Sequence, residues 1–312
     1  MSRDLKHKRG LLSSELVHNW RLYAMFMPVA AYMLVFAYAP MTGIVVAFKD
    51  FNYKQGIWGS PWIGWENFRY FVQSGKLAQV TLNTVLYNIA FLAAYLFFSI
   101  LVAVLIGEMT SKTAKKTFQT MLFMPYFISW VTVSAIVYNL FNYEYGLVNS
   151  LLKAWGQAPV DIYSSSSLWP FIMPLFYVWK WVGFGSVLFL AAIAGLDREC
   201  YEAASIDGAS VVTRIMRITL PQLKPTIVIL TLLGVGRIMR GEFDMFYQLI
   251  GNNGNLMDAT DIIDTLVFRS LITSQDFGMS SAASLYQSAL CFVIILAVNQ
   301  IVRRQDRSQA LF

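Results

Sequence analysis

Long apolar runs alternate with short polar segments along almost the whole of this 312-residue chain. A helix needs about 20 predominantly apolar residues to cross a bilayer. Six runs reach that length, and polar or charged stretches separate each run from the next. The pattern therefore predicts an all-α membrane protein with six transmembrane helices, over residues 22–47, 81–107, 118–141, 168–194, 225–250 and 283–302.

The composition strengthens this prediction. The chain is 57% hydrophobic and only 13% charged, whereas soluble domains carry about 25% charged residues. A soluble protein of this size could not cover its core with so few charges, and a disordered chain would be poor in apolar residues. The first run follows basic residues, as in a signal peptide, but it is too long for a signal-peptide core and no small-residue cleavage site follows it. We therefore expect it to be a retained first span.

The net charge of +6 is explained by topology. Lysines and arginines concentrate before the first run, after the sixth, and in the loops that follow the second and fourth runs. Because cytoplasmic segments carry an excess of these residues, both termini are predicted to be cytoplasmic. No nucleic-acid partner is needed to explain the charge. The histidines (His7 and His18) lie in the N-terminal tail, and Cys200 and Cys291 are far apart, so neither a metal site nor a disulfide is predicted.

One cytoplasmic loop differs from the others. It lies between the fourth and fifth runs and reads LDRECYEAASIDGASVVTRIMRITLPQLKP. Small and apolar residues recur in it at helical spacing, Gly208 allows either a turn or the close approach of another backbone, and Pro221 and Pro225 are expected to mark its end. The sequence predicts a helix–turn–helix at the membrane surface. A connector resting on lipid headgroups is the alternative, but it would carry more Lys, Trp and Phe, so a docking surface is favoured.

The same loop carries a family resemblance. Its fixed residues match the EAA loop of binding-protein-dependent ABC importer permeases (the MetI-like transmembrane domain) in identity and spacing: Glu202, Ala203, Ala204, Gly208, Ile218, Leu220 and Pro221. The segments LNTVLYN and FMPYFISW look like the carbohydrate branch of that family. The segments APMTGIVVAFKDFN and GIWGSPWIGWENF resemble permeases for oligosaccharides and polysaccharide fragments.

The resemblance implies a coupling role for this loop. In such permeases it forms a coupling helix seated in a cytoplasmic ATPase subunit, and the implied contact set is Glu202, Ala203, Ala204, Asp207, Gly208 and Arg214. The implied partners are an ATPase dimer that binds ATP and Mg, a second permease of distinct sequence, and an external solute-binding protein. This chain would itself be no enzyme and hold no cofactor, consistent with its lack of a GxxxxGK[ST] phosphate loop. Its expected location is the bacterial cytoplasmic (inner) membrane.

The resemblance also divides the chain. Residues 78–302 resemble the permease core with five transmembrane helices. We expect the other parts to be a cytoplasmic basic tail over 1–21, a first helix with an external aromatic loop over 22–77, and a cytoplasmic tail over 303–312.

Charged residues inside the spans mark a candidate substrate pathway. They are costly in a membrane and by default suggest function. Aromatic residues at the same level could pack on sugar rings, and Tyr177 and Trp181 share a helix face by their spacing. The candidate pathway comprises Tyr177, Lys180, Trp181, Phe184, Arg237, Arg240, Glu242, Asp244 and Tyr247. Two interpretations stay open for its charges: counter-charges for an acidic saccharide, or a buried ion-pair network such as Lys180 with Glu242 or Asp244. Gly234, Gly236 and Gly241 could either kink the fifth span or permit close helix packing.

These features together favour the permease subunit of an ATP-driven ABC importer that moves an oligosaccharide or polysaccharide fragment, neutral or acidic, through the lipid membrane. The alternative is an ion-coupled secondary transporter that uses Glu242 and Asp244, but six spans are few for such a carrier and the EAA loop would have no purpose. No histidine, paired cysteine or acidic motif in the spans indicates a membrane-embedded enzyme.

Overall fold

The computed structural model describes residues 18–73 and 75–305 of the chain. Within these residues the regular structure is helical, and the one β-type pairing is an isolated bridge between Lys49 and Trp62. The all-α prediction is confirmed. Residues 1–17 of the predicted basic tail, with His7, and residues 306–312 of the predicted C-terminal tail lie outside the described residues, while the end of the basic tail belongs to the start of the first helix.

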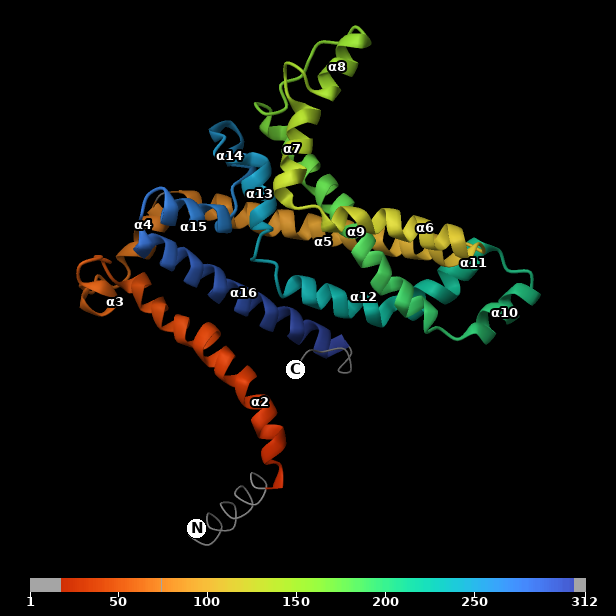
Figure 1. Ribbon diagram of the computed structural model, residues 1–312, viewed down its shortest axis with the longest axis horizontal. Coiled ribbons are helices and arrows are strands. Elements are labelled where there is room, and N and C mark those ends of the chain that lie inside the picture. Colours follow the sequence, from red (N-terminus) through yellow and green to blue (C-terminus); the bar gives the residue numbers. More distant parts are fainter. Residues whose placement is uncertain (1–17, 74, 306–312) are drawn as a thin grey trace.

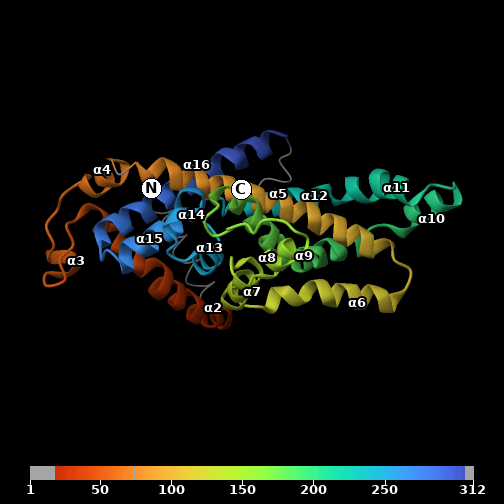
Figure 2. The same ribbon diagram turned by 90° about the horizontal axis from the view of Figure 1, so that it is seen from above.

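Three long helices form the body of the molecule. They are α5 (Lys76–Glu108), α9 (Trp169–Ala194) and α16 (Phe277–Gln305). The α5 helix has 33 residues with no proline and no charge between its first and last positions. At 1.5 Å per residue it is about 50 Å long, which exceeds the bilayer core of about 30 Å. It runs through the length of the body, with α4 and α15 near one end and α10 and α11 near the other (Figures 1 and 2).

Shorter elements complete the chain. In order they are α2 (Trp20–Met33), η1 (Leu34–Tyr38), η2 (Ala39–Phe48), α3 (Gly56–Gly59), α4 (Glu66–Gln73), α6 (Lys112–Phe123), η3 (Met124–Phe127), α7 (Trp130–Phe141), α8 (Leu147–Ala154), η4 (Ser166–Leu168), α10 (Arg198–Ile206), α11 (Val211–Arg214), η5 (Ile215–Thr219), α12 (Leu220–Val235), α13 (Phe243–Ile250), α14 (Gly254–Thr260) and α15 (Ile263–Ile272).

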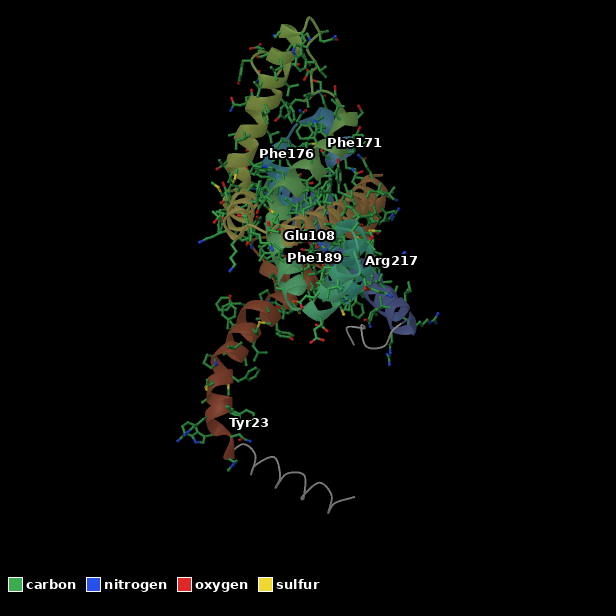
Figure 3. All side chains as sticks on the ribbon, turned by 90° about the vertical axis from the view of Figure 1, so that its right-hand side faces the viewer. Tyr23, Glu108, Phe171, Phe176, Phe189 and Arg217 are labelled. Atoms are coloured by element: carbon green, nitrogen blue, oxygen red, sulfur yellow. The ribbon has the colours of Figure 1, made fainter. Side chains whose placement is uncertain are left out.

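The first predicted span is a continuous helical stretch over Trp20–Phe48. Its α2 portion has no buried residue and extends away from the body of the chain (Figure 1). Figure 3 shows Tyr23 on this arm, far from body residues such as Phe189. An apolar helix without a covering surface in its own chain is suited to contact lipid or another subunit.

Four predicted spans are confirmed as helices long and apolar enough to cross a membrane. They correspond to Trp20–Phe48, Lys76–Glu108, Ser166–Ala194 and Phe277–Arg304. The third predicted span, 118–141, is not one straight helix, because the chain bends by 97° between Lys112–Phe127 and Trp130–Phe141; taken together, these two helices are a broken candidate span. Pro125 lacks the N–H that a continuing helix needs, and Ser129 starts α7 as an N-cap, its hydroxyl accepting a hydrogen bond from Thr132 N.

The fifth predicted span, 225–250, is wrong in its bounds. The apolar helix covers Val211–Val235, and residues 236–242 turn before the separate helix α13 begins. Pro221 and Pro225 do not end the preceding loop as expected. Pro221 occupies the first turn of α12, where a missing N–H is tolerated, and the π-helical turn η5 directly precedes α12.

The buried core consists of three clusters, and α5 contributes to each. Tyr87 and Phe91 belong to a cluster with α7, α9 and α13. Val80 belongs to a second cluster with α4, α15 and α16. Ala103 packs with α9 and α12 in the third. The α5 helix is therefore the element that the rest of the fold is assembled around.

Candidate functional site

The loop between α9 and α12 has the predicted helix–turn–helix form. Asp197 caps α10, its carboxylate accepting a hydrogen bond from Glu199 N at 2.9 Å, and Ser210 caps α11 by accepting one from Thr213 N at 3.2 Å. Between the two helices Gly208 has φ of +75°, a backbone conformation that other residues rarely adopt. A Cβ at Gly208 would meet nothing within 4 Å. Of the two roles considered for this glycine, the structure of the chain itself therefore shows the turn.

Most of the predicted contact set on this loop is exposed. Glu202, Ala203, Asp207 and Gly208 are exposed, and Ala204 is half-buried. Ile206 beside the turn is 86% exposed. Further apolar side chains lie open on the following helical stretch, namely Val211, Val212 and Met216. Exposed apolar side chains gathered on one loop are typical of an interaction site.

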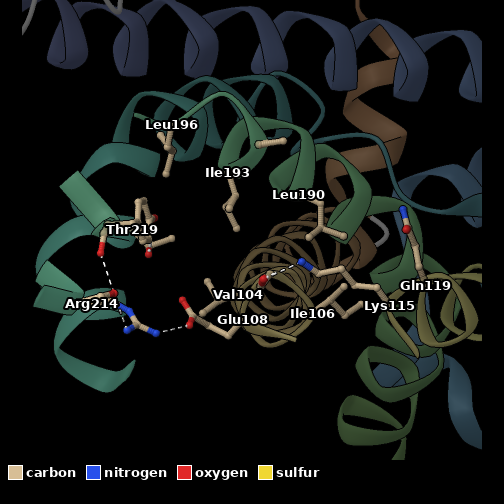
Figure 4. Close-up of a pocket in the computed structure, with 14 residues that line it drawn as sticks. Val104, Ile106, Glu108, Lys115, Gln119, Leu190, Ile193, Leu196, Arg214 and Thr219 are labelled. Atoms are coloured by element: carbon tan, nitrogen blue, oxygen red, sulfur yellow. Dashed lines mark hydrogen bonds and ion pairs between the residues drawn. The ribbon is translucent and has the colours of Figure 1, made fainter. Parts of the chain in front are cut away.

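Arg214 turns back toward the body instead of joining that surface. Its Nη2 lies 3.0 Å from Glu108 Oε2 at the end of α5, and its Nη1 donates to Ser205 Oγ on α10 at 3.2 Å. The hydroxyls of Tyr201 and Thr219 are hydrogen-bonded at 2.8 Å. These contacts border a cavity of about 490 Å³ between the loop and the ends of α5 and α9 (Figure 4). Glu108 was not among the predicted site residues.

Lys180 holds the break in the third span together. It is only 5% exposed, and its Nζ donates to the carbonyl oxygens of Pro125 at 3.3 Å, Tyr126 at 3.2 Å and Ile128. Among the described residues it forms no ion pair with Glu242 or Asp244, so the predicted pairing is not seen. A lysine in this environment satisfies backbone groups that the helix break leaves free.

Trp130, the first residue of α7, lies between Lys180 and Glu242. The Lys180 ammonium is 5.3 Å from its ring centroid, and its indole Nε1 donates to Glu242 Oε1 at 3.3 Å. The two predicted charges therefore share one aromatic neighbour, which sequence reasoning did not single out.

The predicted aromatic residues of α9 pack against other aromatic residues. Tyr177 stacks on Phe91 of α5 with ring centroids 4.4 Å apart, and its ring lies 6.3 Å from that of Trp181. Phe184 stacks on Tyr126 at 5.1 Å. The expected pairing of Tyr177 with Trp181 is confirmed as a contact, but Tyr177 belongs to the periphery of a core cluster. The indole N–H of Trp181 is buried without a hydrogen-bond partner among the described residues.

The turn at 236–242 presents two arginines outward. Arg237 and Arg240 are exposed, while Met239 between them is fully buried in the cluster of α15 and α16. Unwound segments of this kind next to membrane helices are typical of transporter binding sites.

Side chains from two distant helices fix this turn. The Asp264 Oδ2 atom accepts hydrogen bonds from Gly241 N at 2.7 Å and from Gln287 Nε2 at 3.0 Å. Gln287 Nε2 also donates to Met239 O at 2.6 Å. Burial raises the pKa of Asp264, and the hydrogen bonds from Gly241 and Gln287 and the charge of Arg240 oppose that rise. Neither Asp264 nor Gln287 was predicted, because only the fold brings them to this turn.

The glycines of this region serve both predicted purposes. A Cβ on Gly234 would collide with the side chain of Leu92, which indicates close helix packing. Gly241 lies in the turn itself, where a Cβ would collide with Ile262 Cδ1 and come within 3.1 Å of Asp264 Oδ2. The backbone of the turn is therefore pressed directly against the start of α15.

The two remaining predicted residues lie on α13. Asp244 is exposed, and Tyr247 packs between Phe243 and Phe268 at centroid distances of 5.4 and 4.9 Å. Arg237, Arg240, Glu242 and Asp244 thus lie on one short segment, and Trp130 connects Lys180 to it at Glu242. In the part of the chain that is described, no group of three His, Cys, Asp or Glu side chains could hold a metal ion.

Comparisons with known proteins agree on one family. Residues 95–307 match the family described as the inner membrane component of binding-protein-dependent transport systems. A similar curated protein is the polygalacturonan/rhamnogalacturonan transport system permease protein YteP of Bacillus subtilis (strain 168). It is 30% identical over 299 residues, covering 96% of this chain and 92% of that protein.

Two solved structures have the same architecture. One is a bacterial ABC transporter involved in the import of the acidic polysaccharide alginate, with a TM-score of 0.85 and 31% identity, covering 94% of this chain and 98% of that one. The other is a bacterial alginate ABC transporter in complex with an alginate pentasaccharide-bound periplasmic protein. Its TM-score is 0.84 at 30% identity, with coverage of 93% and 96%.

Proposed function

This chain belongs to the family of inner membrane components of binding-protein-dependent transport systems, and we propose that its cargo is an oligosaccharide or polysaccharide fragment that carries carboxylates. As a member of that family it is a multi-pass inner membrane permease of an ABC importer, in which a separate subunit hydrolyses ATP. Family membership removes the support for the alternative of an ion-coupled secondary transporter.

The exposed pair Arg237 and Arg240 is the observation that carries the acidic cargo. Both directly follow the candidate span Val211–Val235, and both point away from the core of their own chain. Charged side chains at membrane depth face protein or water-filled cavities instead of lipid. Guanidinium groups bind carboxylates with two parallel hydrogen bonds, which fits a uronate. The similar proteins named above move alginate or polygalacturonan, and this supports the proposal by similarity.

The loop with α10 and α11 is proposed as the ATPase contact. Its exposed residues Glu202, Ala203, Asp207 and Gly208 and the open apolar side chain of Ile206 support a docked partner. We place this loop and both termini in the cytoplasm, in accordance with the distribution of basic residues.

The expected assembly contains a second, distinct permease and an ATPase dimer besides the external binding protein. The exposed helix α2 supports a contact with another membrane subunit. The complex of a similar alginate importer with its periplasmic protein supports the presence of the binding protein.

Transport in proteoliposomes tests the acidic cargo. The complete complex is reconstituted with its binding protein, and uptake of a uronate oligosaccharide is compared with that of its carboxyl-reduced analogue, both saturating the binding protein. Hydrogen bonds to charged groups contribute about 1.5–3 kcal/mol, or about tenfold to a hundredfold in affinity. We expect Arg240→Gln to weaken uptake of the uronate by that factor and of the reduced analogue far less.

The matched control is Arg69→Gln, which removes an exposed arginine on α4. It should leave both cargoes unaffected. Equal losses for the two cargoes in Arg237→Gln and Arg240→Gln would contradict the role of these arginines as counter-charges.

A further inference from the structure

We propose that Glu108 is a positioning residue for transport, which joins the α10–α11 loop through Arg214 to α5, and that α5 carries the movement of this loop to the turn at 236–242. This inference rests on the proposed function, since it takes the loop to be the part that the ATPase moves.

The contact of Arg214 with Glu108 is the first of two joints, by which we mean the side-chain contacts that connect each end of α5 to its neighbouring segment. Arg214 connects the last residue of α5 to Ser205 on α10. No described residue of α10 belongs to the three buried clusters, and its side chains are hydrogen-bonded to Arg214 and Thr219 of the following segment. Figure 4 shows the ion pair at the border of the cavity. Arg214 therefore gives the loop a direct polar contact with α5, in addition to the packing of α12 on α5 at Leu223 and Ala103.

The position of Glu108 supports a role other than helix stability. A carboxylate at the C-terminus of a helix is disfavoured by the helix dipole. Lys115 of α6 already binds the terminal carbonyl of Gly107 at 2.8 Å, which is the favourable interaction at such an end. The carboxylate of Glu108 is thus an unfavourable choice for α5 alone, and the Arg214 contact supplies the reason for it.

The second element is α5 itself. It has no internal proline, and its only glycine is the penultimate residue Gly107. Both views show it as one continuous helix (Figures 1 and 2). It packs closely on α9, where a Cβ on Gly185 would collide with Ser99 Oγ and the ring of Tyr95. An uninterrupted helix packed in this way, about 50 Å long, is suited to move as one body.

The other joint lies at the opposite end of α5. Gln79, Asn83 and Tyr87 lie one helical turn apart on one face. Gln79 Nε2 donates to Asp258 O at 2.7 Å, and Tyr87 Oη donates to Ala259 O at 3.0 Å. Asn83 Nδ2 donates to the carbonyls of Asp258 and Asp261 at 3.1 and 3.0 Å.

The chain segment held by this joint leads directly to the arginine turn. Ile263 N donates to Thr84 Oγ1 at 3.0 Å. The next residue, Asp264, accepts the hydrogen bond from Gly241 N, and Gly241 is the neighbour of Arg240. A continuous series of contacts thus connects the proposed ATPase contact to the proposed cargo contact, with α5 in between.

Coupling measurements on the complete reconstituted complex test this assignment. We expect Glu108→Gln to lower uptake per ATP hydrolysed at least threefold while hydrolysis without binding protein stays within twofold of wild type. The exchanged pair, Glu108→Arg with Arg214→Glu, should restore at least half of the lost ratio, because it re-forms the ion pair with its charges reversed. An unchanged melting temperature of the Glu108→Gln complex separates this role from a merely local loss of stability. Glu66→Gln is the matched control, because it removes one carboxylate of an exposed ion pair with Arg69.

A second variant at the far joint keeps the proposal testable if Glu108→Gln does not assemble. Asn83→Ala should lower the same ratio although it lies far from the α10–α11 loop. A wild-type ratio in Glu108→Gln or in Asn83→Ala, or no restoration by the exchanged pair, overturns the inference. Failure of the proposed function has a different signature, namely that the wild-type complex shows no uptake dependent on ATP and binding protein.

Discussion

Gly208 offers a direct test of whether the turn between α10 and α11 depends on backbone conformation or on free space. Its φ of +75° is left-handed, which costs an L-residue about 1–2 kcal/mol. A Cβ at this position would meet no atom of the chain within 4 Å. The two explanations therefore make different predictions for different side chains.

Gly208→Asn and Gly208→Val separate the two explanations. Asparagine adopts the left-handed conformation more readily than other non-glycine residues, whereas a β-branched residue avoids it. A cost of 1–2 kcal/mol lowers the ratio of formed to unformed turn by about 5- to 30-fold. We expect Gly208→Val to lose ATP-dependent uptake by up to that factor, and Gly208→Asn to retain most of it.

The assay is uptake by the reconstituted complex, accompanied by co-purification of the ATPase subunit and by the melting temperature of the permease. Because no described residue of α10 belongs to the buried clusters, the turn can open locally, and the melting temperature should change little in either variant. Gly208→Asn would be as defective as Gly208→Val if the ATPase needed the empty space at this position, and that result would refute the conformational explanation.

Three further predictions concern the helix breaks. Lys180→Met should lower the melting temperature, because losing hydrogen bonds from a charged donor and leaving buried carbonyls unsatisfied costs about 1–3 kcal/mol. It should weaken uptake of the uronate and of the carboxyl-reduced cargo equally. A loss confined to the uronate would contradict the structural role. Gly241→Ala should destabilise the protein by about 1–3 kcal/mol through overpacking against Ile262. The control Gly254→Ala, whose Cβ meets nothing within 4 Å, should melt like wild type. Equal melting temperatures for the two variants would be inconsistent with the close contact at Gly241. Gln287→Leu should leave Met239 O without its side-chain donor, and we expect it to lower both the melting temperature and the uptake of uronate. Unchanged values would show that this hydrogen bond does not hold the turn.

The sequence allowed the helical class and the form of the coupling loop to be predicted because both depend on local patterns. Apolar length identifies a membrane helix, and the turn at Gly208 follows from a glycine between two short helical segments. Four of the six predicted spans agree with the structure for this reason.

The two breaks could not be predicted because they lie inside apolar sequence. The groups that satisfy them come from far along the chain: Lys180 binds the carbonyls of residues 125, 126 and 128, and Gln287 binds Met239 O. Hydropathy is the same whether an apolar run continues as a helix or turns. Glu108, Asp264 and Gln287 were missed for a related reason, since each acquires its role from a partner that only the fold brings near.

The break at residues 125–129 has a consequence for how the protein enters the membrane. Backbone carbonyls left free in lipid must find a donor within the protein, and the donor here is a lysine synthesised more than fifty residues later. The third segment is therefore incomplete as an independent insertion unit when it leaves the ribosome. We expect it to be stable in the bilayer only together with α9, whose Lys180 binds these carbonyls.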